Sequence, residues 1–234
     1  VDKELSQRHE VIRIGRNSGD FNVDISDSAS IRKLFEQTGK FDALVCAAGI
    51  YNDARFLDLT EQAFRTMLDV NVVGTFIPAQ EAARRMQAGG RIVTISSRGA
   101  LGGTRFAHYV ASKSALDAWV RTAASEFADK GVNFSIINMP LVKTPMIAPT
   151  KMYDSVPTLS PEEAADLLVK AIIEKPSRIA TRLGIFAALV NAVAPKAYEV
   201  VMNTAFELFP DSAAAKGDRK ALKEAAPSQE QIAF

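Results

Sequence analysis

The chain has 234 residues, of which 28 are Lys or Arg and 27 are Asp or Glu, so its formal net charge is +1. This near-neutral balance argues against a nucleic-acid binder, which usually carries a basic excess. The single cysteine, Cys46, excludes an intramolecular disulfide framework and a zinc site built from several thiolates. The two histidines, His9 and His108, are too far apart in sequence to form a local metal-binding motif.

The sequence predicts no transmembrane segment. Its longest apolar stretch, 183–194, is shorter than the roughly 20 residues that a bilayer-spanning helix needs. The charged start at 1–4 is not followed by the apolar run of a secretory signal. We therefore expect a cytoplasmic location.

In the first part of the chain, short apolar runs alternate with amphipathic stretches. Residues 10–14 are predicted to form a strand and 28–37 a helix. A second strand is expected over 42–47, apolar on both faces, as is typical of parallel strands covered by helices. Thr60 is expected to cap the next helix. Two residues could interrupt that helix, Gly74 and Pro78.

The same alternation continues in the next part of the chain. Strands are expected over 91–96 and 132–137, and a helix over 109–129. Alternation of strand and helix predicts a single α/β domain, a Rossmann-like doubly wound parallel sheet in three α/β/α layers. In such sheets ligands bind beyond the carboxyl ends of the strands. The functional residues are therefore sought just after the strands.

The residues after the first two strands fit a dinucleotide. Arg16 could pair with the 2′-phosphate of NADP, where an acidic residue would favour NAD. A solvated arginine in a polar turn is an equally supported alternative. The pair Asp24-Ile25 lies where a carboxylate could reach the adenine amino group. The small residues of 47–49 allow a close backbone approach, although such triplets are common at strand ends.

The third strand is followed by serines and then by Tyr109-Val110-Ala111-Ser112-Lys113. The four-residue spacing puts Tyr109 and Lys113 on one face of a helix. An ammonium beside a phenol favours the phenolate, and a nearby serine could hold a carbonyl oxygen during proton transfer. An ordinary Tyr–Lys surface pair is the alternative. The serines upstream favour the functional interpretation.

These residues resemble the classical short-chain dehydrogenase/reductases, over about residues 10–182. Tyr109 and Lys113 are similar to the Tyr-x-x-x-Lys pair of that family, and Ser97 to its catalytic serine. Asn71 is similar to the helix asparagine that supports a proton relay to the lysine. The resemblance implies hydride transfer between a nicotinamide and a carbonyl carbon, with the proton supplied by Tyr109.

The resemblance extends to the cofactor site. The turn at 47–49 is similar to an Asn-Asn-Ala-Gly turn beneath the adenine, with both asparagines replaced, and 140–146 to a Pro-Gly-x-Val-x-Thr segment at the nicotinamide. In that family the lysine also holds the nicotinamide ribose. The implied cofactor-binding residues are Arg16, Asp24, Ile25, Ala47, Ala48, Gly49, Tyr109, Lys113, Pro140, Val142 and Thr144.

Three features depart from the family pattern. The glycine-rich phosphate-binding turn and the strand before it are missing, so we expect that roughly 15–20 further residues precede Val1 in the parent protein. Leu141 replaces a glycine. Ser97 and Tyr109 are 12 residues apart, one fewer than is usual, which we attribute to a shorter loop; Ser96 would restore the count.

The segments 105–182 and 209–213 resemble more narrowly the reductase module of bacterial fatty acyl-CoA reductases, in which Leu141 is the expected residue. The first third of the chain lacks this likeness. Together the resemblances imply an NADP(H)-dependent reductase, with NAD(H) less favoured, acting on an aldehyde or ketone that could be hydrophobic or carry a long acyl chain. The alternative is a non-catalytic NADP(H)-sensing or scaffold protein with the same fold.

The last part of the chain is less informative. Residues 1–182 are expected to form the cofactor-binding and catalytic domain, 183–211 a helical extension broken at Pro195, and 212–234 a flexible tail. The extension could cover the substrate, contact another subunit or touch a membrane surface, and we favour the first two. By analogy with the family, helices over 60–86 and 109–129 predict a homodimer or homotetramer.

Overall fold

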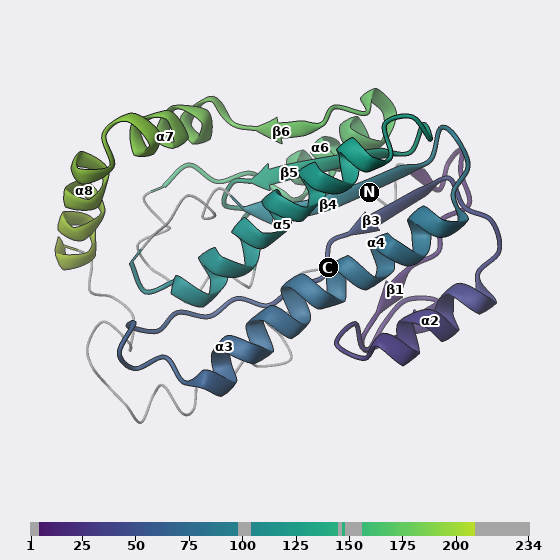
Figure 1. Ribbon diagram of the computed structural model, residues 1–234, viewed down its shortest axis with the longest axis horizontal. Helices are drawn as coiled ribbons and strands as arrows, with labels where there is room; N and C mark the ends of the chain where they lie inside the picture. The colour runs from purple at the N-terminus through teal and green to yellow at the C-terminus, as the bar shows by residue number, and fades with distance from the viewer. Residues whose placement is uncertain (1–4, 98–103, 145–146, 148–155, 209–234) are drawn as a thin grey trace.

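The computed structural model describes residues 5–97, 104–144, 147 and 156–208, and Figure 1 shows the arrangement of the chain. The strands form two parallel sheets. The smaller sheet pairs β1 (Ile14–Gly15) with β2 (Phe21–Asn22). The larger sheet has the order β3-β4-β5-β6, made of β3 (Ala43–Cys46), β4 (Arg91–Ser97), β5 (Asn133–Met139) and β6 (Arg178–Ala180).

The helices occupy the connections between these strands and the segment after β6. They are α2 (Ser28–Gln37), α3 (Glu61–Leu68), the π-helical turn η1 (Asp69–Val73), α4 (Gly74–Arg85), α5 (Ala107–Glu126), α6 (Pro161–Glu174), α7 (Arg182–Val193) and α8 (Pro195–Leu208). Within the described ranges, none of them is long and apolar enough to cross a membrane.

Two hydrophobic clusters lie on opposite faces of the larger sheet. Ile92 of β4 packs in one cluster with Leu34 of α2 and Leu116 of α5. Val93, the next residue of the strand, packs in the other cluster with Leu168 of α6. Because successive strand residues point to opposite faces, helices cover the sheet on both sides. The predicted α/β architecture in three layers is confirmed, although the sheet is divided in two.

Several predicted elements are also confirmed. The helix over 28–37 has the predicted bounds, and the strand predicted over 91–96 continues one residue further. Thr60 caps α3, since its hydroxyl accepts a hydrogen bond from the backbone N–H of Ala63 at 3.2 Å. The chain also breaks at Pro195 between the last two helices, as expected.

Two details of the prediction were wrong. The strand expected over 10–14 is reduced to its last residue plus Gly15, because the backbone N–H of Arg13 donates to the Asp20 carboxylate at 2.8 Å. The helix after Thr60 is not interrupted but runs through η1 into α4, with Pro78 inside it. β2, α6 and β6 were not predicted, and the predicted tail lies outside the described residues.

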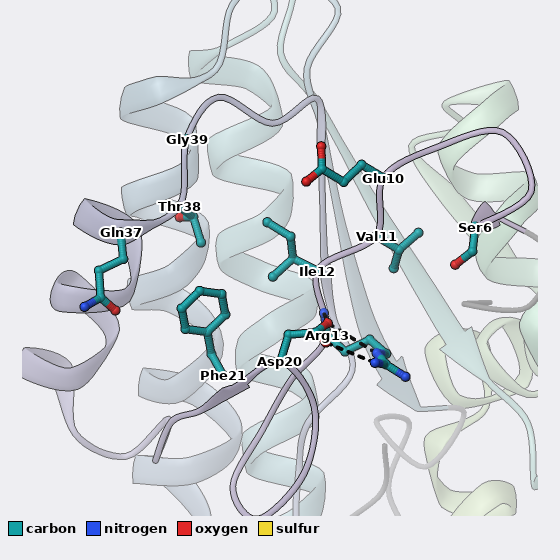
Figure 2. A pocket seen from close by; sticks show the side chains of 10 residues that line it. All are labelled: Ser6, Glu10, Val11, Ile12, Arg13, Asp20, Phe21, Gln37, Thr38 and Gly39. Carbon is teal, nitrogen blue, oxygen red and sulfur yellow. Dashed lines mark hydrogen bonds and ion pairs between the residues drawn. The ribbon is translucent and has the colours of Figure 1, made fainter.

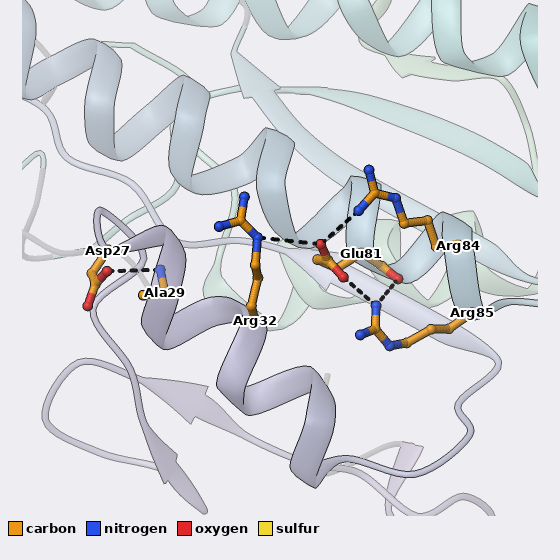
Figure 3. A network of polar contacts seen from close by, with 6 residues as sticks. All are labelled: Asp27, Ala29, Arg32, Glu81, Arg84 and Arg85. Carbon is orange, nitrogen blue, oxygen red and sulfur yellow. Dashed lines mark hydrogen bonds and ion pairs between the residues drawn. The ribbon is translucent and has the colours of Figure 1, made fainter.

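A buried carboxylate joins α2 to α4 (Figure 3). The side chain of Glu81 is only 6% exposed and meets three arginines. Arg32 of α2 lies 3.8 Å away, Arg84 lies 3.2 Å away, and Arg85 bonds to both the carboxylate and the backbone carbonyl of Glu81. Such a charge is tolerated inside a protein only because it is paired. The network therefore fixes α2 against the helix layer that supports the larger sheet.

We predict that Glu81→Gln lowers the free energy of unfolding by about 2 kcal/mol, since it removes the buried charge that holds three more exposed arginines. Denaturant titration would measure the change. Glu61→Gln is the matched control, because it removes an exposed Glu–Arg pair on α3 with 79% and 67% exposed side chains and should leave stability unchanged. Equal effects of both substitutions would contradict the proposed role of Glu81.

Candidate active site

The carboxyl ends of three parallel strands bring the predicted residues to one edge of the larger sheet. Ser97, the last residue of β4, pairs with Met139, the last residue of β5. Cys46 ends β3 opposite Thr94, so residues 47–49 follow at the same edge. The predicted serine, the small-residue turn and the segment from Pro140 therefore lie at the same end of the parallel strands.

Lys113 of α5 reaches this edge from the helix layer. It is only 7% exposed, and its Nζ donates to the backbone carbonyl of Ile95 at 2.9 Å. The same nitrogen lies 5.8 Å from the ring centroid of Tyr109, one turn earlier in the helix. Burial lowers the pKa of Lys113 to about 8, and the negative charge of Asp117 only partly opposes this shift. Tyr109 and Lys113 therefore lie on one face of α5, as their four-residue spacing predicted.

Asn71 connects three segments around Lys113. It is 1% exposed and lies in the π-helical turn η1, a geometry often found at functional sites. Its Oδ1 accepts from the backbone N–H of Ile50 at 2.8 Å, and its Nδ2 donates to the carbonyl of Ile50 at 3.0 Å and to the hydroxyl of Ser112 at 3.1 Å. The amide thus holds the loop after β3 against α5.

Gly49 lies between these two side chains. A Cβ at this position would be 3.1 Å from Oδ1 of Asn71 and 3.8 Å from Nζ of Lys113. The sequence suggested that small residues here serve the approach of a ligand. The structure adds a second reason, because the absence of a side chain keeps Asn71 close to the loop.

The two consecutive serines of β4 have different environments. Ser96 is 1% exposed, and its hydroxyl donates to the backbone carbonyl of Lys113 at 3.2 Å, which ties the strand to α5. Ser97 is the next residue and ends β4, so it lies at the carboxyl edge of the sheet. The structural hydrogen bond of Ser96 leaves Ser97 as the candidate catalytic serine.

A second polar link holds α5 to the sheet. The amide nitrogen of Asn138 in β5 donates to both oxygens of Asp117 at 3.1 Å, and Arg178 of β6 donates to the amide oxygen of Asn138 at 2.5 Å. Asp117 lies one helical turn after Lys113. The link therefore fixes a negative charge near the buried ammonium.

The Tyr109 ring belongs to a chain of three aromatic rings, with Tyr51 in the middle. The ring of Tyr51 is 5.2 Å from that of Tyr109, edge to face, and 5.6 Å from that of Phe106. These contacts join the loop after β3 to the start of α5. Tyr51 was missed by the sequence analysis because nothing in its local pattern distinguishes it.

His108 is buried beside Tyr109 and is held by the same loop. It is 0% exposed, and its Nε2 hydrogen-bonds to Oδ1 of Asn52. Burial lowers the pKa of His108, which favours the neutral imidazole. The backbone N–H of Ala54 donates to the carbonyl of Arg105 at 2.9 Å. The loop is therefore fastened to the start of α5 by two hydrogen bonds near the tyrosine.

The residues predicted to bind the adenosine half lie after β1 and β2. Arg16 forms an ion pair with Asp24 at 3.4 Å, and both side chains are about half exposed. Hydrogen bonds from the hydroxyl and the backbone N–H of Ser26 lower the pKa of Asp24, with a smaller effect of Arg16. Ile25 packs on Gly74, where a Cβ would lie 2.9 Å from the carbonyl of Ile25. The sequence did not foresee that the two predicted cofactor residues bind each other.

The segment after β5 is extended, and Leu159 anchors it. Val142 forms an isolated parallel bridge with Leu159, and the backbone N–H of Lys143 donates to the Leu159 carbonyl at 2.9 Å. The hydroxyl of Thr144 donates to the carbonyl of Val142 at 3.3 Å. Pro140 to Thr144 thus continues from the sheet edge near Ser97, while most of the predicted substrate loop after Thr144 lies outside the described residues.

An open pocket of about 670 Å³ lies elsewhere, between the segment that leads into β1 and the end of α2 (Figure 2). The ion pair between Arg13 and Asp20 borders it, with Nη2 and Oδ1 separated by 3.0 Å. None of the candidate catalytic residues lines this pocket. It is therefore separate from the site around Tyr109.

Comparison with known proteins places the chain in a family. Residues 4–153, more than half of the chain, match the family described as short chain dehydrogenase. A fatty acyl-CoA reductase of Acinetobacter baylyi is 53% identical over 134 residues, which are 57% of this chain and 45% of the reductase. The uncharacterized oxidoreductase Mb1570 of Mycobacterium bovis is 35% identical over 226 residues, covering 89% of this chain and 65% of its own length. The chain thus spans less than two thirds of either relative.

Solved structures agree with this assignment. A short chain dehydrogenase from Burkholderia cenocepacia in complex with NADP is 26% identical, with a TM-score of 0.60 over 67% of this chain and 69% of its own. A 4-hydroxyisoleucine dehydrogenase complexed with NADH is 27% identical, with a TM-score of 0.64 over 74% of this chain and 83% of its own. The chain therefore belongs to the short-chain dehydrogenase family of oxidoreductases.

Proposed function

We propose that the protein is an NADP(H)-dependent reductase of an aldehyde or ketone, with Tyr109 as the proton donor. The observation that carries this proposal is the buried ammonium of Lys113, which lies 5.8 Å from the centroid of the Tyr109 ring and close to Gly49. A charge held inside a protein against its solvation cost is a feature of functional sites. Here it favours the phenolate once the proton of Tyr109 has been transferred.

Each candidate residue has a separate part in proton transfer. The hydroxyl of Tyr109 donates its proton to the substrate carbonyl oxygen, and the hydroxyl of Ser97 holds and polarises that oxygen. Asn71 fixes the loop after β3 beside Lys113 and supports replacement of the proton on the tyrosine. A nicotinamide dinucleotide supplies the hydride when bound.

The donor set of the site suits such a cofactor. Arg16 carries a half-exposed guanidinium that can bind a ribose 2′-phosphate in place of the Asp24 carboxylate, and Asp24 and Ile25 lie on the predicted adenine side. Ala47, Ala48 and Gly49 allow the cofactor to approach the sheet edge. Pro140, Val142 and Thr144 are the candidates for contact with the nicotinamide, and Lys113 for contact with its ribose. A related structure contains NADP and another NADH, so Arg16 is the feature that supports NADP(H) here.

The surroundings of the tyrosine support a hydrophobic substrate. The ring of Tyr51 lies against Tyr109, and the ring of Phe106 lies against Tyr51, so aromatic surface is close to the phenol. The Acinetobacter relative is named for the reduction of fatty acyl-CoA. We propose a carbonyl compound with an apolar or long acyl chain as the substrate class.

We predict that Tyr109→Phe lowers kcat for carbonyl reduction by about a thousandfold, because it removes the proton donor while leaving the ring in place. Loss of NADPH absorbance with a panel of aldehydes and ketones would measure turnover. Tyr51→Phe is the matched control, since its ring packs on Tyr109 and its loss of a hydroxyl should leave kcat within a few-fold. Full turnover by Tyr109→Phe would refute the mechanism. NADPH binding without turnover of any carbonyl by the unaltered protein would favour the cofactor-sensing alternative.

The cofactor assignment predicts that Arg16→Ala raises the KM for NADPH about tenfold and leaves the KM for NADH unchanged, because one charge-assisted hydrogen bond to the phosphate is lost. Steady-state kinetics with both cofactors would show this. Arg13→Ala is the control, as Arg13 also pairs with an aspartate but borders the separate pocket. An unchanged ratio of the two KM values in Arg16→Ala would contradict the role of Arg16.

The buried lysine also predicts an effect on stability. At pH 7 the folded protein holds Lys113 charged although its pKa is lowered from 10.5 to about 8, which costs about 3 kcal/mol. The free energy of unfolding of Lys113→Met should therefore be about 2 kcal/mol higher than that of the unaltered protein, after allowance for the lost hydrogen bond to Ile95. Between about pH 8 and 10.5 the unfolded chain keeps a proton that the folded chain has lost, so the advantage of the variant should shrink as the pH rises.

Denaturant titrations at pH 7 and pH 10 would check both the sign and the trend. Lys170→Met is the control, because Lys170 is exposed and pairs with Glu174, and its substitution should give no comparable pH dependence. Two results would contradict a buried charge on Lys113. One is a variant that is less stable than the unaltered protein at pH 7, and the other is a difference in unfolding free energy that does not depend on pH.

A further inference from the structure

The candidate proton donor lies in the first turn of a helix. Tyr109 is the third residue of α5. The residue before the helix, Phe106, makes no capping hydrogen bond with its side chain. The first N–H groups of a helix have no partner within it, and helix ends fray unless other groups hold them. The position of the phenol therefore depends on contacts from outside α5.

Two hydrogen bonds from the loop after β3 hold this end of the helix. The backbone N–H of Ala54 donates to the carbonyl of Arg105 at 2.9 Å, just before α5 begins. The side chain of Asn52 bonds through Oδ1 to Nε2 of His108 in the first turn. A carbonyl oxygen can only accept, so Nε2 carries the hydrogen of the neutral ring. The imidazole is therefore the donor that ties the first turn to the loop.

The same loop carries the ring that packs on the phenol. The ring of Tyr51 meets that of Tyr109 edge to face, with centroids 5.2 Å apart. Its neighbour Asn52 is held by the imidazole, and its other neighbour, Ile50, is held by the amide of Asn71. Because both neighbours are anchored, the ring of Tyr51 has a fixed place beside the phenol.

Stability alone does not explain a histidine at position 108. The side chain is 0% exposed, and its Nδ1 has no hydrogen-bond partner among the described residues. A buried polar atom without a partner costs free energy, and an apolar side chain would not have this cost. Such an atom in a folded protein needs an explanation. The bond between His108 and Asn52, one residue from the phenol, supplies one.

We infer that Asn52 and His108 form a positioning pair, which fixes the first turn of α5 so that the Tyr109 hydroxyl stays aligned with the substrate carbonyl. Neither side chain contacts the reacting atoms in this role, because both act through Tyr109. The inference rests on the proposed reaction. It predicts an effect on kcat and not on cofactor binding, since Arg16 and the other candidate cofactor residues do not bond to the pair.

We predict that Asn52→Ala lowers kcat for carbonyl reduction about 30-fold and leaves the KM for NADPH within about twofold, because a shift of a reacting group by roughly 1 Å can cost about 100-fold in rate. His108→Leu should have the same effect, and the double variant should lose no more, since either substitution already breaks the bond. His108→Gln should recover most of kcat, because its amide nitrogen can donate from nearly the same place as Nε2. Gln62→Ala is the control, as it removes an exposed amide hydrogen bond on α3.

A second measurement tests the positioning pair without turnover. In Asn52→Ala, hydrogen exchange of the backbone N–H of Ala54 should be faster by at least about tenfold, because the loop is released from α5. The N–H of Ile50 should keep its rate, since Asn71 still holds it. The N–H of Ile137, a fully buried residue of β5, reports global unfolding and should also keep its rate.

Four results would overturn the inference. The first is an Asn52→Ala variant whose kcat stays within about threefold of the unaltered protein, or whose loss lies in KM instead. The second is His108→Gln being as impaired as His108→Leu. The third is an unchanged exchange rate at Ala54. The fourth is equally faster exchange at Ile137, which would show a role in overall stability only.

These results are distinguishable from failure of the proposed function. An unaltered protein that reduces no carbonyl would refute the proposed function. The exchange rates at Ala54, Ile50 and Ile137 would then still decide whether the bond between Asn52 and His108 holds the loop on α5.

Discussion

The site depends on one buried charge. Lys113 holds its ammonium inside the protein against the carbonyl of Ile95, where desolvation lowers its pKa to about 8. A buried ammonium is costly unless its surroundings compensate for the lost water. The groups around Lys113 provide part of that compensation. Asp117 supplies a nearby negative charge, and Tyr109 presents its ring to the same nitrogen.

The fold positions this charge through contacts between the sheet and α5. The parallel register ends β4 and β5 at the same level, so the site has a defined edge. Ser96 ties β4 to the backbone of Lys113, and Asn138 ties β5 to Asp117 one turn further along α5. Asn71 adds the loop after β3 to the same assembly. These contacts join the strands, the helix and the loop into one assembly, as the proposed proton transfer would require.

The sequence predicted the parts of this site that depend on local spacing. The four-residue spacing of Tyr109 and Lys113 on a helix follows from periodicity. The strand was predicted to end one residue before Ser97, and the resemblance to the family singled out that serine. Contacts between distant segments could not be predicted in this way. Three of these contacts depend on how separate segments pack. They are the ion pair of Arg16 with Asp24, the hydrogen bond of His108 with Asn52, and the close approach of Asn71 to Gly49. The helical extension was predicted, but the outward direction of its large apolar side chains required the structure.

The central claim is that the ammonium of Lys113 is desolvated beside Tyr109. Heteronuclear NMR of isotope-labelled lysine, with the Lys113→Met variant to assign the signal, would give its titration midpoint directly. The structure predicts a midpoint near pH 8. A midpoint near the ordinary value of 10.5 would show that the ammonium is solvated and would contradict the account.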